Sequence, residues 1–414
     1  MKNVYIFGVG KGKETVREYL IEDNVRLLGY IDNNAHRFPD GVDGKRVYRL
    51  EEIADDFDYI IVSVMRYQYI DEQLSDAGIR RDRIIHFFSY DDAIRESYWV
   101  VLNKNGWRLE AMSFEFEKKT RPYSQNMIYE LADPRSRRKI EFPKISPAQE
   151  AVALVCREHR SLVRFGDGEF ELMRMKVRSK FQSANGELAE RMREILRSDT
   201  EEVLIAIADN YGSLDRYTEA AAEDIRAYMT PQTRREHMAL LDLEKTYYDA
   251  YLSRPYMIYR DKEAAGGKFE ALRQIWRGRD VLIVEGGQTR MGVGNDLLAD
   301  AHSVRRILGP SVNAYDKYAQ ILACVKETAE RGELILLALG ATASVLAYDL
   351  ACDGFWAVDI GHLDLEYEWY HAGLRERCDI PYKYVNEIYR GNQVCELPET
   401  LREDYEKQIV RDLS

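Results

Sequence analysis

Short apolar runs alternate along this chain with segments in which apolar residues recur at helical spacing. The clearest runs occupy residues 4–7, 58–63, 203–207, 280–284 and 334–339. Each run has the length of a buried strand, and the segments between them have room for helices. Strands that alternate with helices form parallel sheets, because a crossover between parallel strands needs a dozen or more residues. The alternation therefore predicts an α/β protein built on parallel sheets.

The pattern divides the chain into parts. Its 414 residues suffice for two or three domains, at roughly 150 residues per domain. Residues 1–90 predict a small parallel α/β domain, and residues 146–414 predict a larger one. Residues 91–145 are more polar and are punctuated by prolines, so we expect a connector with some helix. Its basic run at residues 135–139 predicts a solvated surface or, alternatively, a patch that faces an anionic acceptor or a membrane.

A glycine turn follows the first predicted strand. Residues 8–12 read Gly-Val-Gly-Lys-Gly, and a second strand ends at Asp32. This unit resembles the opening of a Rossmann-type domain, in which glycines approach a pyrophosphate and an acidic residue meets a ribose hydroxyl. Gly8, Gly10 and Asp32 are therefore candidate nucleotide-binding residues. Lys13 stands where the full fingerprint has its third glycine, so NAD(P), another nucleotide or sugar nucleotide, and a turn without a ligand all stay open.

The charge balance and the cysteines exclude several classes of protein. Asp and Glu number 71 against 59 Lys and Arg, a formal net charge of −12, which argues against nucleic-acid binding but allows a local basic site. No apolar run approaches the roughly 20 residues that span a bilayer. The N-terminus lacks a signal-peptide pattern, and the five cysteines form no CxxC pair. We expect a cytoplasmic protein with reduced thiols.

Acidic residues follow the predicted strands of the second domain. In an open parallel sheet, ligands bind beyond the carboxyl ends of the strands. The strand at 161–165 leads to Asp167 and Glu169 in a glycine-flanked turn, and the strand at 355–360 leads to Asp359 and His362. Two carboxylates so close together can converge on a hard cation, which prefers oxygen ligands. Asp167 and Glu169 are candidate ligands of Mn²⁺ or Mg²⁺. The alternative is a structural turn, in which Asp167 makes capping and turn hydrogen bonds and Glu169 is solvated.

Five blocks of the second domain resemble, in order, the GT-D class of glycosyltransferases, a family first catalogued as a domain of unknown function. The resemblance covers residues 146–390. Its blocks lie at residues 164–169, 253–256, 284–297, 340–350 and 359–368, and the first reads Arg-Phe-Gly-Asp-Gly-Glu. In that family a DXE motif helps to bind metal and nucleotide diphosphate, and the matching residues here are Asp167 and Glu169.

The resemblance implies transfer of a sugar from a nucleotide sugar, with a UDP-sugar as the expected donor and Mn²⁺ or Mg²⁺ as cofactor. The implied acceptor is a carbohydrate or glycoprotein in surface glycan assembly. The chemistry agrees with the residues present. Breaking the anomeric C–O bond leaves charge on the diphosphate, which a divalent cation and arginine or backbone donors stabilise.

Several residues are candidates to bind the donor. Arg164 and Arg290 could clamp the diphosphate, since guanidinium matches phosphate bidentately, and Arg254 could line the sugar or nucleotide site. Pairing with nearby carboxylates is the alternative for each arginine. Gly340 and Thr342 precede a helix and offer backbone N–H groups and a hydroxyl to a phosphate, although an ordinary turn uses the same residues.

Three residues are candidates for catalysis. Glu285 and Asp359 could each act as a general base on the acceptor hydroxyl or support their neighbours. His362 could bind the metal or a phosphate, or it could be a structural hydrogen-bonding residue. Asn295 and Asp296 are expected to hold the loop after Glu285 in shape.

Two other functions stay open beside the favoured glycosyltransferase. One is an NAD-dependent nucleotide-sugar oxidoreductase or epimerase, with NAD in the first domain, although no Tyr-x-x-x-Lys dyad stands in a recognisable context. The other is a non-catalytic sensor of sugar nucleotides, which would bind its ligand without turnover.

Overall fold

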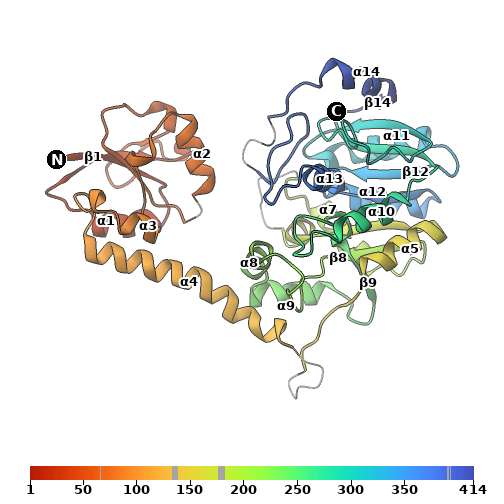
Figure 1. Ribbon diagram of the computed structural model, residues 1–414, viewed down its shortest axis with the longest axis horizontal. Coiled ribbons are helices and arrows are strands. Elements are labelled where there is room, and N and C mark those ends of the chain that lie inside the picture. Colours follow the sequence, from red (N-terminus) through yellow and green to blue (C-terminus); the bar gives the residue numbers. More distant parts are fainter. Residues whose placement is uncertain (66, 133–138, 176–181, 389–390, 392) are drawn as a thin grey trace. The chain divides into compact units, whose positions relative to one another are not determined.

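Two compact units make up the protein. The computed structural model describes residues 1–65, 67–132, 139–175, 182–388, 391 and 393–414. The chain divides into Met1–Ser124 and Gln125–Ser414. Each unit contains one parallel sheet with helices packed against it (Figure 1). The predicted α/β class, with a small N-terminal sheet and a larger second one, is confirmed.

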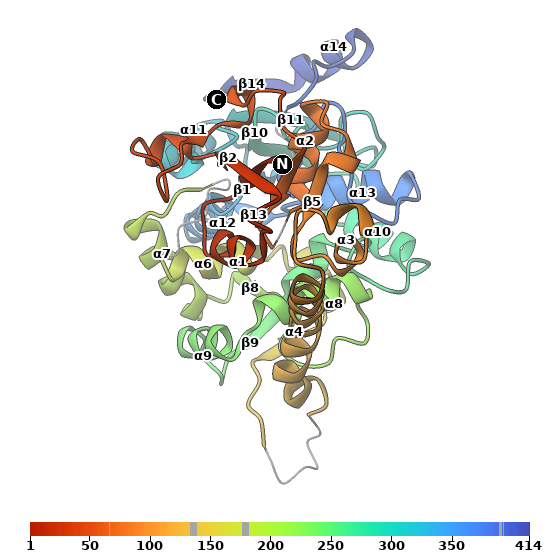
Figure 2. The same cartoon turned by 90° about the vertical axis from the view of Figure 1, so that its left-hand side faces the viewer.

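The first unit has a five-stranded sheet in the order β3-β2-β1-β4-β5, and every pairing in it is parallel. This strand order runs outward in both directions from β1 and β4, so the topological switch point lies between these two strands. Figure 2 shows β2, β1 and β5 of this sheet in that order. The strands are β1 (Lys2–Phe7), β2 (Val25–Ile31), β3 (Val47–Tyr48), β4 (Tyr59–Val62) and β5 (Ile84–His86). The helices are α1 (Gly12–Tyr19), α2 (Gln68–Asp76), α3 (Tyr90–Ala93) and the short 3₁₀ helices η1 (Ala35–Arg37), η2 (Leu50–Glu52), η3 (Arg81–Arg83) and η4 (Glu96–Tyr98).

The expected connector contributes to this first unit. Tyr98, Leu102 and Trp107 are buried in the same core as Val16 of α1. The indole N–H of Trp107 donates to the backbone oxygen of Phe87 at 2.6 Å. Trp107 belongs to α4 (Lys104–Glu130), the long helix in which one unit ends and the next begins. Residues 91–124 therefore belong to the first unit, while most of the basic run at residues 135–139 lies outside the described residues.

The second unit has a nine-stranded sheet in the order β14-β11-β10-β12-β13-β7-β8-β9-β6. All of its pairings are parallel. Its strands are β6 (Lys144–Ser146), β7 (Ser161–Phe165), β8 (Val203–Ile207), β9 (Thr246–Asp249), β10 (Asp280–Gly286), β11 (Ser303–Gly309), β12 (Leu334–Ala338), β13 (Trp356–Asp359) and β14 (Ile409–Asp412).

Helices cover both faces of this sheet. They are α5 (Ala148–Glu158), α6 (Asp167–Met173), α7 (Gly186–Arg197), α8 (Glu219–Tyr228), α9 (Pro231–Leu240), η5 (Ala250–Ser253), α10 (Ala265–Arg273), η6 (Ala314–Lys317), α11 (Tyr318–Thr328), α12 (Thr342–Cys352), α13 (Leu363–His371) and α14 (Glu399–Gln408). In the described part of the chain, no helix has both the length and the apolarity needed to cross a membrane.

The strands bury side chains on both faces because successive side chains of a strand point to opposite sides. Leu282 and Val284 of β10 pack into one core together with α6, α7, α11 and α12. Val281 and Ile283 of the same strand pack into the other core together with α5, α10 and α13. This double burial explains why residues 281–284 form one continuous apolar run.

Candidate active site

Several candidate residues of the second unit lie on or directly after β13 and β7, which are neighbours in the sheet, whereas Glu285 and Arg290 lie on β10 and the loop that follows it. Val358 of β13 pairs with Leu162 of β7, although the two strands are far apart in sequence. Strands β12 and β13 approach this point from one side of the sheet, and β8 and β9 continue on the other. Because two series of strands meet here, their carboxyl ends form the topological switch point at which open α/β sheets bind ligands.

Arg164 and Asp359 connect the two strands at this point. The Nη2 of Arg164 lies 2.7 Å from Oδ1 of Asp359, and its Nε donates to the Asp359 backbone oxygen at 3.0 Å. Its Nη1 donates to the hydroxyl of Ser253 at 2.6 Å. Burial raises the pKa of Asp359, and the charge of Arg164 opposes that shift. Arg164 therefore takes the alternative open to it, pairing with a carboxylate.

Asp167 and Glu169 both lie on the first turn of α6. The Oε2 of Glu169 accepts a hydrogen bond from the backbone N–H of Gly166 at 2.8 Å. Burial raises the pKa of Glu169 in spite of this bond, whereas Asp167 is exposed. The turn thus holds one carboxylate by a backbone bond and presents the other to solvent.

The donor set of this turn fits a hard cation in part. Among the described residues, no group of three or more His, Cys, Asp and Glu side chains is placed to hold a metal ion. Two carboxylates suit Mn²⁺ or Mg²⁺ if water and phosphate oxygens complete the coordination. A cation beside Glu169 would also offset the cost of burying its charge.

Arg254 and His362 lie within one polar cluster. The Nη2 of Arg254 lies 2.5 Å from Oε1 of Glu387, and its Nη1 lies 4.0 Å from Oε1 of Glu366. His362 precedes α13, and its Nε2 lies 4.0 Å from Oε1 of Glu387. Burial, followed by the charge of Arg254, lowers the pKa of His362 to about 4. The imidazole is consequently neutral at neutral pH.

Glu387 is the member of this cluster that the sequence alone did not single out. It lies in a stretch without helical or strand periodicity, after the last block of the family resemblance. Its position inside the resembling range, residues 146–390, is the one sequence signal that includes it. Its role depends on Arg254, which lies 133 positions earlier in the chain.

Glu285 is completely buried and paired. Its Oε1 lies 2.6 Å from Nη1 of Arg306 on β11, and its Oε2 accepts the backbone N–H of Met291 at 2.8 Å. Both oxygens thus have protein donors. This arrangement favours the supporting role among the two that the sequence left open for Glu285.

The loop after β10 is held from several directions. Arg290 donates through Nη1 to the backbone oxygens of Tyr382 and Cys395, each at 2.9 Å, so it anchors the loop to a later segment of the chain. Asn295 donates to Asp364 at 2.8 Å and to Glu368 at 2.7 Å.

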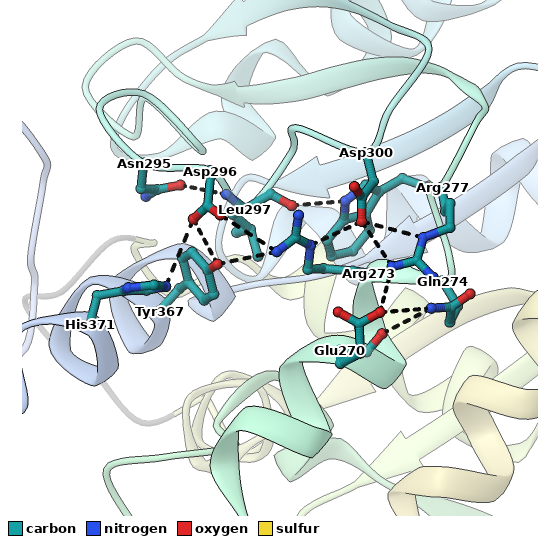
Figure 3. A network of polar contacts seen from close by, with 11 residues as sticks. Glu270, Arg273, Gln274, Arg277, Asn295, Asp296, Leu297, Asp300, Tyr367 and His371 are labelled. Atoms are coloured by element: carbon teal, nitrogen blue, oxygen red, sulfur yellow. Dashed lines mark hydrogen bonds and ion pairs between the residues drawn. The ribbon is translucent and has the colours of Figure 1, made fainter.

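Figure 3 shows Asp296 of the same loop among side chains of α10 and α13. The hydroxyl of Tyr367 donates to Oδ1 of Asp296 at 2.8 Å, and Arg273 lies 3.7 Å from its Oδ2. Asn295 and Asp296 thus make the contacts expected of residues that hold this loop in shape.

Gly340 and Thr342 begin the turn between β12 and α12. Thr342 is fully buried, and its hydroxyl lies 3.5 Å from Oε1 of Gln182. Gly340 is exposed at the carboxyl end of β12. Of the two, Gly340 is the residue that a phosphate can approach from solvent.

The glycine turn of the first unit lies beside Asp32. The Oδ2 of Asp32 lies 3.4 Å from the backbone N of Val9. Gly8 has φ +100°, and a Cβ there would come within 2.7 Å of Cγ2 of Val64. A Cβ on Gly10 would meet no atom within 4 Å. The fold thus requires a glycine at position 8, whereas position 10 is open.

Family models match both units. One described as glycosyltransferase GT-D fold matches residues 162–388, and one described as C2185-like, N-terminal, matches residues 1–85. The probable glycosyl transferase Gly of Streptococcus gordonii is 35% identical over 295 residues, and glycosyltransferase GlyD of Streptococcus pneumoniae serotype 4 is 32% identical over 293 residues. These alignments cover 69% and 70% of this chain, but they span only 40% and 35% of the relatives' own length.

Solved structures agree with these matches. A structure described as a new glycosyltransferase from Streptococcus sanguinis is 34% identical, has a TM-score of 0.62, and covers 66% of this chain and 100% of its own. Another, described as a highly conserved domain with a distinct glycosyltransferase fold, is 33% identical with a TM-score of 0.62 and covers 70% and 99%. The residues at the junction of β7 and β13 all fall inside the matched range, and this chain belongs to the glycosyltransferase GT-D fold family.

Proposed function

We propose that this protein transfers a sugar from a nucleotide sugar, with a UDP-sugar as donor, and that Asp167 and Glu169 hold the divalent cation that the transfer needs. The observation that carries the proposal is the pair of carboxylates on the first turn of α6, at the switch point of the sheet. Membership of the GT-D fold family supports it. When bound, Mn²⁺ or Mg²⁺ would neutralise the charge that develops on the diphosphate leaving group.

Exposure separates the three catalytic candidates. The side chain of His362 is 26% exposed, whereas those of Glu285 and Asp359 are 0% and 3% exposed. We therefore assign contact with the substrate to His362, whose neutral imidazole can accept a proton or a hydrogen bond. Asp359 then supports the site by its ion pair with Arg164. Glu285 supports it by holding the loop that follows β10, through the backbone N–H of Met291.

Arg254 is the arginine best placed to meet the anionic donor. Its side chain is 21% exposed and lies in the same cluster as His362. All three nitrogens of Arg164 donate to protein oxygens, and Arg290 donates through Nη1 to two backbone oxygens, so we assign both a supporting role. Guanidinium groups bind phosphate strongly when they face it in a fixed orientation.

We also propose the class of the acceptor. Family resemblance favours a carbohydrate or glycoprotein acceptor in surface glycan assembly. Because the curated relatives extend well beyond the matched region, other parts of such a protein could select the acceptor. Donor hydrolysis and transfer should therefore be assayed separately.

The test is UDP release from a panel of UDP-sugars by the purified chain with MnCl₂. We expect turnover that EDTA abolishes, and a loss of roughly 100-fold or more in Asp167→Asn and in Glu169→Gln. Glu150→Gln is the matched control, since Glu150 also lies in the first turn of a helix and is exposed. Full turnover in both site variants would refute the metal assignment, and ligand binding without turnover would favour a sensor.

We further propose that the glycine turn of the first unit binds a nucleotide, with NAD(P) and sugar nucleotides as the two classes to test. The open position at Gly10 and the carboxylate of Asp32 beside Val9 support this proposal. Titration with NADH, followed by its fluorescence, and calorimetry with UDP-sugars in the Asp167→Asn background separate the two classes. Copurified NAD would revive the oxidoreductase alternative.

A further inference from the structure

The carboxylate of Glu387 has cationic and basic groups on several sides. Its Oε1 lies 2.5 Å from Nη2 of Arg254, and its Oε2 lies 2.8 Å from Nε of Arg377. The imidazole Nε2 of His362 lies 4.0 Å from the same Oε1. The Glu387 side chain is only 12% exposed. Water therefore contributes little to the solvation of this carboxylate, and these side chains replace it.

The charge of Glu387 is stable in this surrounding. Burial by itself would raise the pKa of Glu387, but Arg254, His362 and Arg377 together hold it well below its usual range. Conversely, Glu387 raises the pKa of His362, while burial and the charges of Arg254, Arg164 and Arg377 lower it. Glu387 is thus an ionised carboxylate whose neighbours include two of the proposed donor-binding residues.

Glu366, a second carboxylate near Arg254, has a different role from Glu387. The Oε2 of Glu366 accepts the backbone N–H groups of Tyr256 and Met257, at 3.0 and 2.7 Å. Its other oxygen is 4.0 Å from Nη1 of Arg254. Glu366 therefore holds the backbone that follows Arg254, whereas Glu387 determines where the guanidinium points.

We infer that Glu387 is a positioning residue of the transfer site, which holds the guanidinium groups of Arg254 and Arg377 beside His362 so that they can receive the anionic nucleotide diphosphate. The inference rests on the proposed function. It does not require Glu387 to touch the substrate. Without this carboxylate, Arg254 loses its closest anion and becomes free to adopt other rotamers. The guanidinium of Arg254 then loses its orientation although the protein still folds.

The first test compares Glu387→Gln, Glu387→Asp and the wild type in calorimetric titration with UDP and MnCl₂ and in steady-state kinetics. We expect Glu387→Gln to weaken UDP binding and raise KM by about tenfold or more, with a smaller effect on kcat. Glu387→Asp should restore part of the affinity because it keeps the charge. Glu376→Gln, at an exposed glutamate that precedes Arg377 in the chain, should behave as the wild type. UDP affinity and KM unchanged in Glu387→Gln would overturn the inference.

A second test needs no substrate, so it separates this inference from the proposed function. Carbon-13 labelled histidine spectra report the titration of His362, assigned by comparison with His362→Gln. The titration midpoint of His362 should rise in Arg254→Gln and fall in Glu387→Gln, while thermal stability identifies any variant that fails to fold. If both shifts occur but the wild-type protein neither binds nor turns over UDP-sugars, the proposed function is wrong. The interaction of Glu387 and Arg254 with His362 is then confirmed all the same. If neither shift occurs, the assignment of Glu387 is wrong.

Discussion

The guanidinium of Arg164 lies directly against Gly361. A Cβ on Gly361 would come within 1.9 Å of Nη2 of Arg164, and Gly361 itself has φ +49°. The absence of a side chain at this position is what lets Arg164 reach the Asp359 carboxylate. The block at residues 359–368 thus contains a glycine that is required by Arg164, a residue far earlier in the chain.

Gly361→Ala should displace Arg164 as well as strain the backbone. The positive φ alone costs roughly 1–2 kcal/mol for a residue with a Cβ, and the clash adds to it. Gly373→Ala is the matched control, because Gly373 has φ +63° and no atom within 4 Å of an added Cβ. We expect a larger loss of melting temperature and of UDP affinity in Gly361→Ala. Equal effects of the two substitutions would contradict the role assigned to the Arg164 contact.

Asp249 should make the second unit less stable at high pH. It is 5% exposed at the end of β9, and burial raises its pKa from 3.8 to about 6. A carboxyl with a raised pKa in the folded state contributes stability below its unfolded pKa, and this contribution is lost as pH rises through 6. Asp249→Asn keeps an oxygen for the Tyr251 N–H bond and removes the charge.

The stability gain from Asp249→Asn should therefore depend on pH. We expect up to about 3 kcal/mol at pH 8, on the basis of roughly 1.4 kcal/mol per pKa unit, and a smaller gain at pH 5. Urea unfolding at the two pH values measures it, with the exposed Asp224→Asn as control. A gain of the same size at both pH values would show that the charge of Asp249 is not its cause.

Lys383 should be among the most sensitive positions of the second unit. Its side chain is 0% exposed, and Nζ lies 2.7 Å from Oδ2 of Asp364 and 2.7 Å from Oε1 of Glu368. Lys383→Met leaves two carboxylates without their cation, which costs about 3–5 kcal/mol. Lys407→Met, at a side chain that is 62% exposed, should cost little. Adding Asp364→Asn to Lys383→Met should recover part of the loss, and no recovery would mean that lost packing, rather than charge, dominates.

The glycines of the first unit should respond differently to alanine. A Cβ on Gly12 would come within 2.1 Å of the backbone oxygen of Ser63, whereas one on Gly10 would meet nothing within 4 Å. Gly12→Ala should destabilise the unit by on the order of 1–3 kcal/mol, and Gly10→Ala should change stability little. Urea unfolding of the whole chain followed by tryptophan fluorescence, to which Trp99 and Trp107 of the first unit contribute, measures both. If the turn binds a nucleotide, Gly10→Ala weakens that binding without this loss of stability.

Much of the fold could be predicted from local pattern. The runs at residues 203–207, 280–284 and 334–339 became β8, β10 and β12, because strands buried on both faces are apolar throughout. The sequence pattern does not predict strand β11, because Arg305 and Arg306 interrupt its apolar run. Arg306 can be buried in this strand because it pairs with Glu285 on the neighbouring strand β10. A charge that is balanced only in three dimensions has no signature in a single stretch of sequence.

How far the first unit extends along the chain also depends on tertiary packing. The polar sequence around Trp107, within residues 91–145, predicts a connector. In the fold Trp107 is fully buried against Phe87, which lies 20 positions away. Burial of this kind depends on where a helix docks, and the helix α4 shows little of that in its own periodicity.

The sequence by itself determined the α/β class, the alternation of strands and helices, and the placement of Asp167 and Glu169 at a strand end, because these depend on periodicity and on neighbours along the chain. Only the tertiary structure decided what each charged residue does. Arg164 pairs with Asp359 across 195 positions, and Arg254 pairs with Glu387 across 133. A buried charge is stable only beside its partner, and which partner it meets follows from the order of strands in the sheet rather than from the order of residues in the chain.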